Sequence, residues 1–126
     1  MGGTDAKTAP ALENMRFATG YDNMKYYLSD SDYERQPIHW VYLRLSDLFL
    51  TYAEALLQAD NNFTDALYWV NEVRKRVGLG KLEDCLPNKN LTSDKDALLE
   101  EILRERACEL GMEDSRYFDL IRYKRA

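Results

Sequence analysis

Residues 41–59, VYLRLSDLFLTYAEALLQA, constrain the fold more than any other part of this sequence. Apolar side chains recur there at helical spacing along one face, at Leu45, Leu48, Phe49, Tyr52, Leu56 and Ala59. A second apolar stripe covers much of the opposite side, at Leu43, Leu50, Ala53 and Leu57. A helix that is apolar on nearly all sides needs neighbours on several sides. The stretch therefore predicts a core helix that begins between Ile38 and Val41 and ends near Ala59.

Turn-forming residues at 60–62 end this helix, and a second helix is predicted from Asp65 to Val77. Thr64 is its expected N-cap, and Asp65 is well placed for the positive end of the helix dipole. The expected buried stripe is Ala66, Val70, Val73 and Val77. Gly78 follows as a predicted left-handed C-cap, and residues 81–92 are expected to form a loop.

Two more helices are predicted towards the C-terminus. The segment Ser93-Asp94-Lys95-Asp96 has the form of a capping box, which favours a helix over 94–110. The expected buried side of that helix consists of Leu98, Leu99, Ile102, Leu103, Arg106 and Leu110. Gly111 interrupts the pattern, and a short helix is expected over 114–122.

The N-terminal part gives weaker patterns. Residues 1–18 are expected to form a flexible segment, residues 19–28 an extended aromatic stretch, and residues 29–37 a surface loop. The fold class is therefore all-α, with about four helices in antiparallel hairpins and an irregular N-terminal segment. Residues 53–74 also resemble a tetratricopeptide unit, and one such unit cannot cover its own faces without neighbours.

Charge and composition exclude several classes of protein. The 126 residues carry 22 acidic and 17 basic side chains, and a net charge of −5 argues against nucleic acid as a partner. No apolar run approaches the roughly 20 residues that span a bilayer, and residues 1–10 do not form a secretory signal. Cys85 and Cys108 lack metal-ligand spacing, so no metal or cofactor is expected, and two free thiols are favoured over a disulfide.

A series of charged residues near the C-terminus is the most distinctive polar feature. It consists of Glu105, Arg106, Glu109, Glu113, Arg116, Asp119 and Arg122. Helical spacing places Glu105 and Glu109 near Arg106, and an arginine can bridge carboxylates from two helices. The favoured interpretation is a structural set of salt bridges across the break at Gly111. A catalytic carboxylate pair or a di-metal site is the alternative. Helical di-metal sites use histidines as well as carboxylates, and His39 is the single histidine in the chain.

His39 also has no candidate nucleophile, so no catalytic residues and no enzymatic activity are predicted. Aromatic residues make up 12% of the chain, and exposed aromatic faces are what carbohydrate sites use. The candidates for ligand contact are Trp40, Trp69, Tyr26 and Tyr27. Core packing is the alternative for each of them, and it is the expected role of Tyr52, Tyr117 and Phe118.

Three ordered stretches resemble the C-terminal part of the SusD/RagB family of nutrient-binding outer-membrane lipoproteins. They are residues 43–55, LRLSDLFLTYAEA, residues 66–79, ALYWVNEVRKRVGL, and residues 102–122, ILRERACELGMEDSRYFDLIR. Upstream, Thr19-Gly20-Tyr21 and Lys25-Tyr26 fit the same family pattern, so the resemblance spans about residues 19–125. The chain departs from the family at Asp114, where a glycine is usual, and at Asp47, where glutamate is usual.

The resemblance implies that residues 19–126 are the C-terminal helical part of a SusD-like domain from a longer protein. It implies binding of oligosaccharides, or sometimes peptides, at the outer-membrane surface, where a lipid anchor lying outside this sequence would hold the protein. The implied partner is a SusC-like TonB-dependent transporter. The matching motifs are packing and salt-bridge motifs, so the resemblance assigns no residue to a ligand. The alternative function is a small helical protein–protein interaction module of tetratricopeptide type. Missing neighbours would leave apolar helix faces exposed, which favours self-association.

Overall fold

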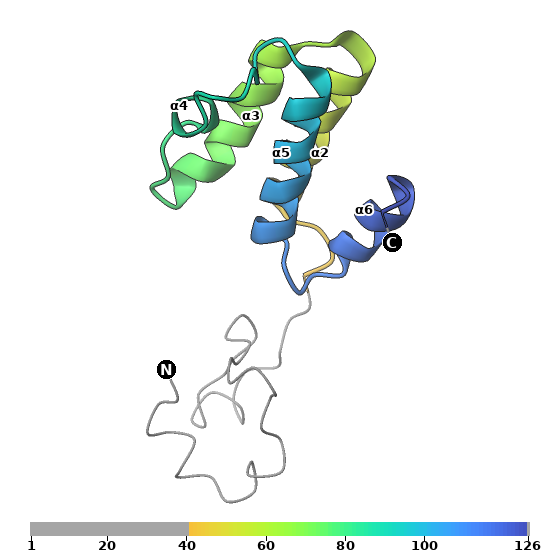
Figure 1. Ribbon diagram of the computed structural model, residues 1–126. Coiled ribbons are helices and arrows are strands. Elements are labelled where there is room, and N and C mark those ends of the chain that lie inside the picture. The colour runs from red at the N-terminus through yellow and green to blue at the C-terminus, as the bar shows by residue number, and fades with distance from the viewer. Residues whose placement is uncertain (1–40, 126) are drawn as a thin grey trace, which may run out of the picture. The chain divides into compact units, whose positions relative to one another are not determined.

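The computed structural model describes residues 41–125, and in this part of the chain all regular structure is helical. The elements are α2 (Leu45–Asp60), α3 (Phe63–Arg76), α4 (Leu82–Cys85), α5 (Lys95–Glu109) and α6 (Ser115–Arg122) (Figure 1). The all-α prediction is therefore confirmed. The expected features of residues 1–40, including the position of His39, lie outside the described residues.

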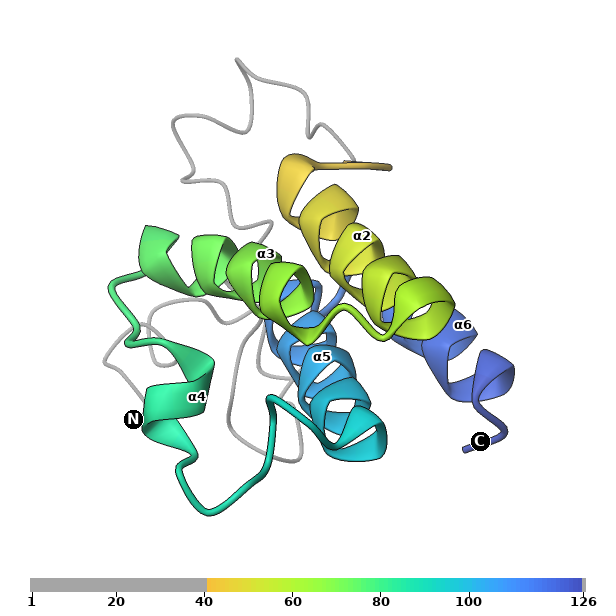
Figure 2. The same ribbon diagram turned by 90° about the horizontal axis from the view of Figure 1, so that it is seen from above.

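The core of the described part lies where α2, α3 and α5 meet. Residues Asn61 and Asn62 link α2 to α3, and α5 runs beside α2 and packs against both helices (Figures 1 and 2). The buried apolar side chains are Leu50, Ala53 and Leu57 of α2, Ala66, Leu67, Val70 and Val73 of α3, and Leu98, Leu99, Ile102 and Leu103 of α5. Leu82 and Leu91 of the α3–α5 connection complete the cluster.

Helix α2 begins later than predicted. Arg44 is its N-cap and has extended backbone angles, φ −140° and ψ 163°, so residues 41–44 precede the helix. The periodic pattern did not reveal this boundary because apolar residues continue on both sides of it. Asn61 ends the helix in the left-handed conformation with φ 51°.

Only one of the two apolar stripes of α2 is buried by the described residues. Leu50, Ala53 and Leu57 of the second stripe are fully buried, whereas Leu45 and Leu48 of the first stripe are 62% and 49% exposed. The reason is that α3 and α5 pack against one side of α2. Within residues 41–125, α2 is therefore a core helix on one side, and its exposed side agrees with the expectation that missing neighbours would leave apolar helix faces open.

Helix α3 starts two residues earlier than expected. Its N-cap is Asn62, not Thr64, because the Asn62 side chain accepts a hydrogen bond from the backbone N–H of Asp65 at 3.2 Å. The predicted stripe is right at Ala66, Val70 and Val73 but wrong at Val77, which lies past the end of the helix and is exposed. Gly78 adopts the predicted left-handed conformation with φ 75°.

Helix α4 was not predicted, because a single turn gives too short a pattern. Its buried anchor is Leu82, whose backbone N–H donates to the side-chain oxygen of Asn71 at 2.8 Å. The Asn71 amide in turn donates to Glu83 at 2.9 Å. Asn71 of α3 thus holds the start of α4 against α3.

The predicted buried side is confirmed at all six positions, five within α5 and the sixth at its C-cap Leu110, and Glu101 is buried as well. The N-cap is Asp94 instead of Ser93, since the Asp94 carboxylate accepts from the backbone N–H of Ala97 at 3.1 Å. Helix α6 begins at Ser115 after Asp114, which has φ 63°.

Core packing is the wrong expectation for three aromatic side chains. Among the described residues Tyr52, Tyr117 and Phe118 are 51%, 63% and 65% exposed. The last two lie on α6, which turns its charged side towards α2 and α5 and its apolar side outwards. The short helix is therefore attached chiefly through polar contacts.

Candidate functional site

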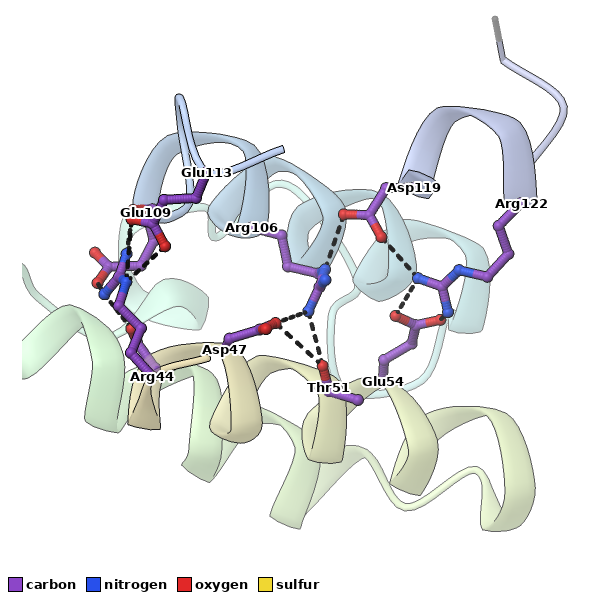
Figure 3. Close-up of polar contacts among 10 residues, drawn as sticks. Arg44, Asp47, Thr51, Glu54, Arg106, Glu109, Glu113, Asp119 and Arg122 are labelled. Atoms are coloured by element: carbon purple, nitrogen blue, oxygen red, sulfur yellow. Dashed lines mark hydrogen bonds and ion pairs between the residues drawn. The ribbon is translucent and has the colours of Figure 1, made fainter. Parts of the chain in front are cut away.

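Three groups of charged side chains connect the helices, and two of them join α2 to the C-terminal part of the chain (Figure 3). The central group is built around Arg106 of α5. Its Nε donates to Asp119 of α6 at 2.9 Å, and its Nη1 donates to Asp47 at 3.0 Å and to Thr51 at 2.9 Å, both on α2. Arg106 and Asp119 are only 7% and 4% exposed, so one guanidinium joins three helices inside the protein.

The same group continues along α6. Arg122 donates to the two carboxylate oxygens of Glu54 at 2.5 and 2.9 Å, and to Asp119 at 2.9 Å (Figure 3). The Tyr123 hydroxyl also donates to Glu54. Hydrogen bonding to Glu54 raises the pKa of Arg122, and partial burial together with Glu54 raises the pKa of Tyr123. Both groups therefore hold their protons at neutral pH.

The second group surrounds Arg44 at the start of α2. Its Nε donates to Glu113 at 2.9 Å and its Nη1 to Glu109 at 2.5 Å (Figure 3). Glu113 is the main reason that the pKa of Arg44 is raised. Partial burial disfavours the charged form of Glu109, but the hydrogen bond and charge of Arg44, with help from Ser46 and Arg76, outweigh it and lower the pKa of Glu109.

The third group joins α3 to α5 and to the α3–α4 connection. Arg74 is buried, pairs with Glu105 and donates through Nε to the backbone oxygen of Gly80 at 2.9 Å. Arg116 instead donates to the backbone oxygen of Leu103, at 3.4 Å.

The predicted series of charged residues is thus distributed over separate places. Arg106, Asp119 and Arg122 come together, Glu109 and Glu113 share Arg44, and Glu105 pairs with Arg74. Helical spacing suggested that Glu105 and Glu109 lie near Arg106. Instead, both glutamates form their salt bridges with arginines of other segments. The sequence pattern did not indicate the partners Arg44, Asp47, Glu54 and Arg74. Asp47, Thr51 and Glu54 follow the spacing i, i+4, i+7, which could have indicated a polar face on α2.

Chemically, this arrangement suits a structural role. Each carboxylate named above accepts a hydrogen bond from at least one arginine, so its hydrogen-bonding capacity is met within the partly buried contacts between helices. Within residues 41–125, no three His, Cys, Asp or Glu side chains are grouped so that they could hold a metal ion. Cys85 and Cys108 are free, exposed thiols.

Trp69 is the one ligand candidate that falls in the described residues, since Tyr26, Tyr27 and Trp40 lie outside them. Its ring centroid lies 4.7 Å from Phe49, 5.7 Å from Tyr52 and 5.2 Å from Tyr68. Trp69 and Phe49 are half-buried, whereas Tyr52 and Tyr68 are exposed. These four residues form an aromatic cluster that joins α2 to α3 and is partly exposed.

A groove of about 730 Å³ lies between α3 and the segment that leads to α4. Its apolar lining is Phe63, Leu67, Tyr68 and Leu79. Its polar lining includes Asn71, Glu72, Lys75, Lys81 and Glu83. Tyr68 belongs both to this groove and to the aromatic cluster. A smaller hollow of about 230 Å³ lies beside Arg44, Phe49 and Arg76.

Between residues 41 and 125, every helix is either too short or too polar to cross a membrane. Comparison with known proteins identifies the family of the chain. A family model described as the SusD family matches residues 2–126. The chain therefore belongs to the SusD family, as the three sequence motifs indicated.

Two curated relatives carry matching names. A "SusD-like protein" from Bacteroides ovatus is 36% identical over 91 residues, which is 71% of this chain and 14% of the relative. "SusD-like protein P38" from Formosa agariphila is 36% identical over 87 residues, which is 68% of this chain and 17% of the relative. The chain thus spans about one sixth or less of these relatives. No solved structure matches it significantly.

Proposed function

We propose that this chain is the C-terminal helical part of a nutrient-binding protein that captures glycans at the cell surface and delivers them to a SusC-like TonB-dependent transporter. Membership of the SusD family over residues 2–126 is the observation that carries the proposal. The protein acts by binding and performs no chemistry on its ligand. It works at the outer membrane, held there by a lipid anchor.

The geometry of the described residues supports two separate roles, one set of residues for stability and another for ligand binding. The residues shared with the family motifs, such as Arg74, Arg106 and Asp119, are buried and tie helices to one another. The aromatic cluster of Phe49, Tyr52, Tyr68 and Trp69 is partly open to solvent. Sugar C–H faces stack on exposed aromatic rings of this kind. The first set therefore holds the scaffold, and the second is available for recognition.

A small helical interaction module is the second candidate function. The apolar residues Leu45 and Leu48 of α2 and Tyr117, Phe118 and Ile121 of α6 are exposed among the described residues. Exposed apolar patches of this kind are used for protein–protein contact. In this case the occupant is a peptide or partner helix, and the same patches also favour self-association of the chain.

Affinity electrophoresis separates these two functions. The intact chain is run through gels that contain soluble neutral polysaccharides, beside Trp69→Ala, Trp40→Ala and the ring-preserving control Trp69→Phe. The glycan proposal predicts that at least one polysaccharide retards the wild-type chain and that a Trp→Ala change reduces the retardation. Unchanged mobility in every gel, with binding to amphipathic peptides instead, supports the interaction module and contradicts glycan capture.

Self-association has its own test. Light scattering at increasing protein concentration measures the molar mass of the chain. A rise above the 14.7 kDa of one chain supports exposed apolar faces as contact surfaces. A constant monomer mass with a cooperative thermal transition argues against them.

A further inference from the structure

The groove between α3 and the α4 segment joins an exposed aromatic ring to a set of hydrogen-bonding side chains. Its volume of about 730 Å³ falls within the range of roughly 300–1,000 Å³ that is usual for small-molecule sites. Tyr68 is 54% exposed, and its ring meets Trp69 edge-on at an interplanar angle of 81°. Tyr68 therefore contacts Trp69 and also lines the groove with an exposed side chain.

The charges along the groove balance. Glu72 and Glu83 oppose Lys75 and Lys81, and two of the polar contacts are internal: Lys75 lies 3.6 Å from Glu72, and Asn71 donates to Glu83 at 2.9 Å. A groove without net charge gives no electrostatic advantage to an anionic or a cationic ligand. It does supply both donors and acceptors, which complement hydroxyl groups because each hydroxyl can donate and accept.

Local structure keeps these groups in place before any ligand arrives. Asn71 is held by two hydrogen bonds, one from Leu82 N–H at 2.8 Å and one to Glu83. Gly78 provides the left-handed turn after α3 that brings Leu79 and Lys81 alongside that helix. A preformed site loses less conformational entropy on binding than a flexible one.

From these observations we infer that the α3–α4 groove is a binding subsite for an uncharged oligosaccharide, with Tyr68 as the stacking residue. This inference rests on the proposed glycan-binding function and adds the location and the charge class of the ligand. A sugar ring lies against Tyr68, apolar carbons meet Phe63 and Leu79, and hydroxyls meet the polar rim.

Isothermal titration calorimetry of the intact chain tests the subsite. The probes are cellohexaose, maltohexaose and xylohexaose, with hexagalacturonate as the charged comparison. We expect at least one neutral hexasaccharide to bind more tightly than hexagalacturonate. Tyr68→Ala should weaken that binding by about tenfold, the scale of a lost aromatic contact. Tyr68→Phe and Tyr117→Ala, a similarly exposed tyrosine on α6, should change it by less than about twofold.

The outcomes are distinguishable. Neutral binding that is unaffected by Tyr68→Ala, in a variant with wild-type circular dichroism, overturns the groove and leaves glycan capture standing. Preferential binding of hexagalacturonate overturns the uncharged ligand class. Absence of binding by all four probes to the wild-type chain counts against both the groove and the proposed function. Amide chemical-shift changes over 63–83, and not over 115–123, provide independent support by NMR.

Discussion

The guanidinium Nε of Arg106 lies 2.9 Å from the carboxylate of Asp119 in an almost fully buried ion pair. Through its Nη1, the same arginine reaches Asp47 and Thr51, so α2, α5 and α6 meet at one side chain (Figure 3). Buried charges are costly unless they are paired and hydrogen-bonded. Removal of the arginine would leave two carboxylates without this partner.

Arg106→Ala should therefore lower the free energy of unfolding by about 3–5 kcal/mol, as expected for one partner of a buried pair. Urea denaturation followed by circular dichroism measures the loss. Arg104→Ala is the matched control, because its exposed side chain lies 3.7 Å from Glu101 on the same helix and should contribute roughly 0–1 kcal/mol. Equal effects of the two substitutions would contradict the central position of Arg106.

Glu54 holds the C-terminal end of α6, since it accepts from both Arg122 and Tyr123. Glu54→Gln should loosen α6 while leaving α3 intact, because the neutral amide cannot accept the same pair of charged hydrogen bonds. Hydrogen exchange by mass spectrometry should show faster exchange over 115–125 and unchanged exchange over 66–74. Glu72→Gln, on α3, serves as the control. Unchanged exchange over 115–125 would show that α6 is held by other contacts.

The sequence predicted the elements better than their boundaries. The buried side of α5 follows from strict helical spacing, and a glycine directly after a helical pattern correctly predicted the left-handed turn at Gly78. The start of α2 could not be predicted, because Leu43 continues the apolar pattern although Arg44 is extended. The caps at Asn62 and Asp94 each lie beside another residue with similar capping chemistry, so propensity alone could not choose between them.

In the candidate site, too, the sequence indicated which residues matter but not which partners they contact. Charged residues near the C-terminus were conspicuous, but their partners depend on how α2 packs, which spacing along one helix cannot reveal. Trp69 was among the aromatic candidates for ligand contact. Tyr68 was not, because an exposed tyrosine on a helix carries no signal until the groove beside it is visible.

Acid should weaken the contact between the start of α2 and the end of α5. The ordinary pKa of a glutamate is about 4.3. The pKa of Glu109 in the folded chain is lowered from its ordinary value, so the unfolded chain binds the proton more readily than the folded chain. The stabilisation is therefore complete above that pKa and is lost as pH falls through the lower, folded value.

Urea denaturation between pH 3 and pH 7 measures this dependence. Glu109→Gln should reduce the pH dependence on the acid side, whereas Asp60→Asn at the exposed end of α2 should leave that part of the profile unchanged. Identical profiles for the wild-type chain and Glu109→Gln would contradict the contribution assigned to Glu109.

Gly78 has φ 75°, and a Cβ built there meets no atom within 4 Å. Gly78→Ala should therefore lower the free energy of unfolding by about 1 kcal/mol through backbone strain alone. Gly78→Asn should cost less, because asparagine tolerates the left-handed region better. Thermal denaturation of the three proteins provides the ranking. An alanine variant as stable as the wild-type chain would contradict the assigned conformation.

Glycan recognition is the central claim, and parallel glycan and peptide arrays test it most directly. The fluorescently labelled intact chain is applied to both arrays at the same concentration and ionic strength. The proposed function predicts retention on one or more related neutral glycans and no comparable signal on peptides. Retention on peptides alone would contradict glycan capture and favour a helical interaction module.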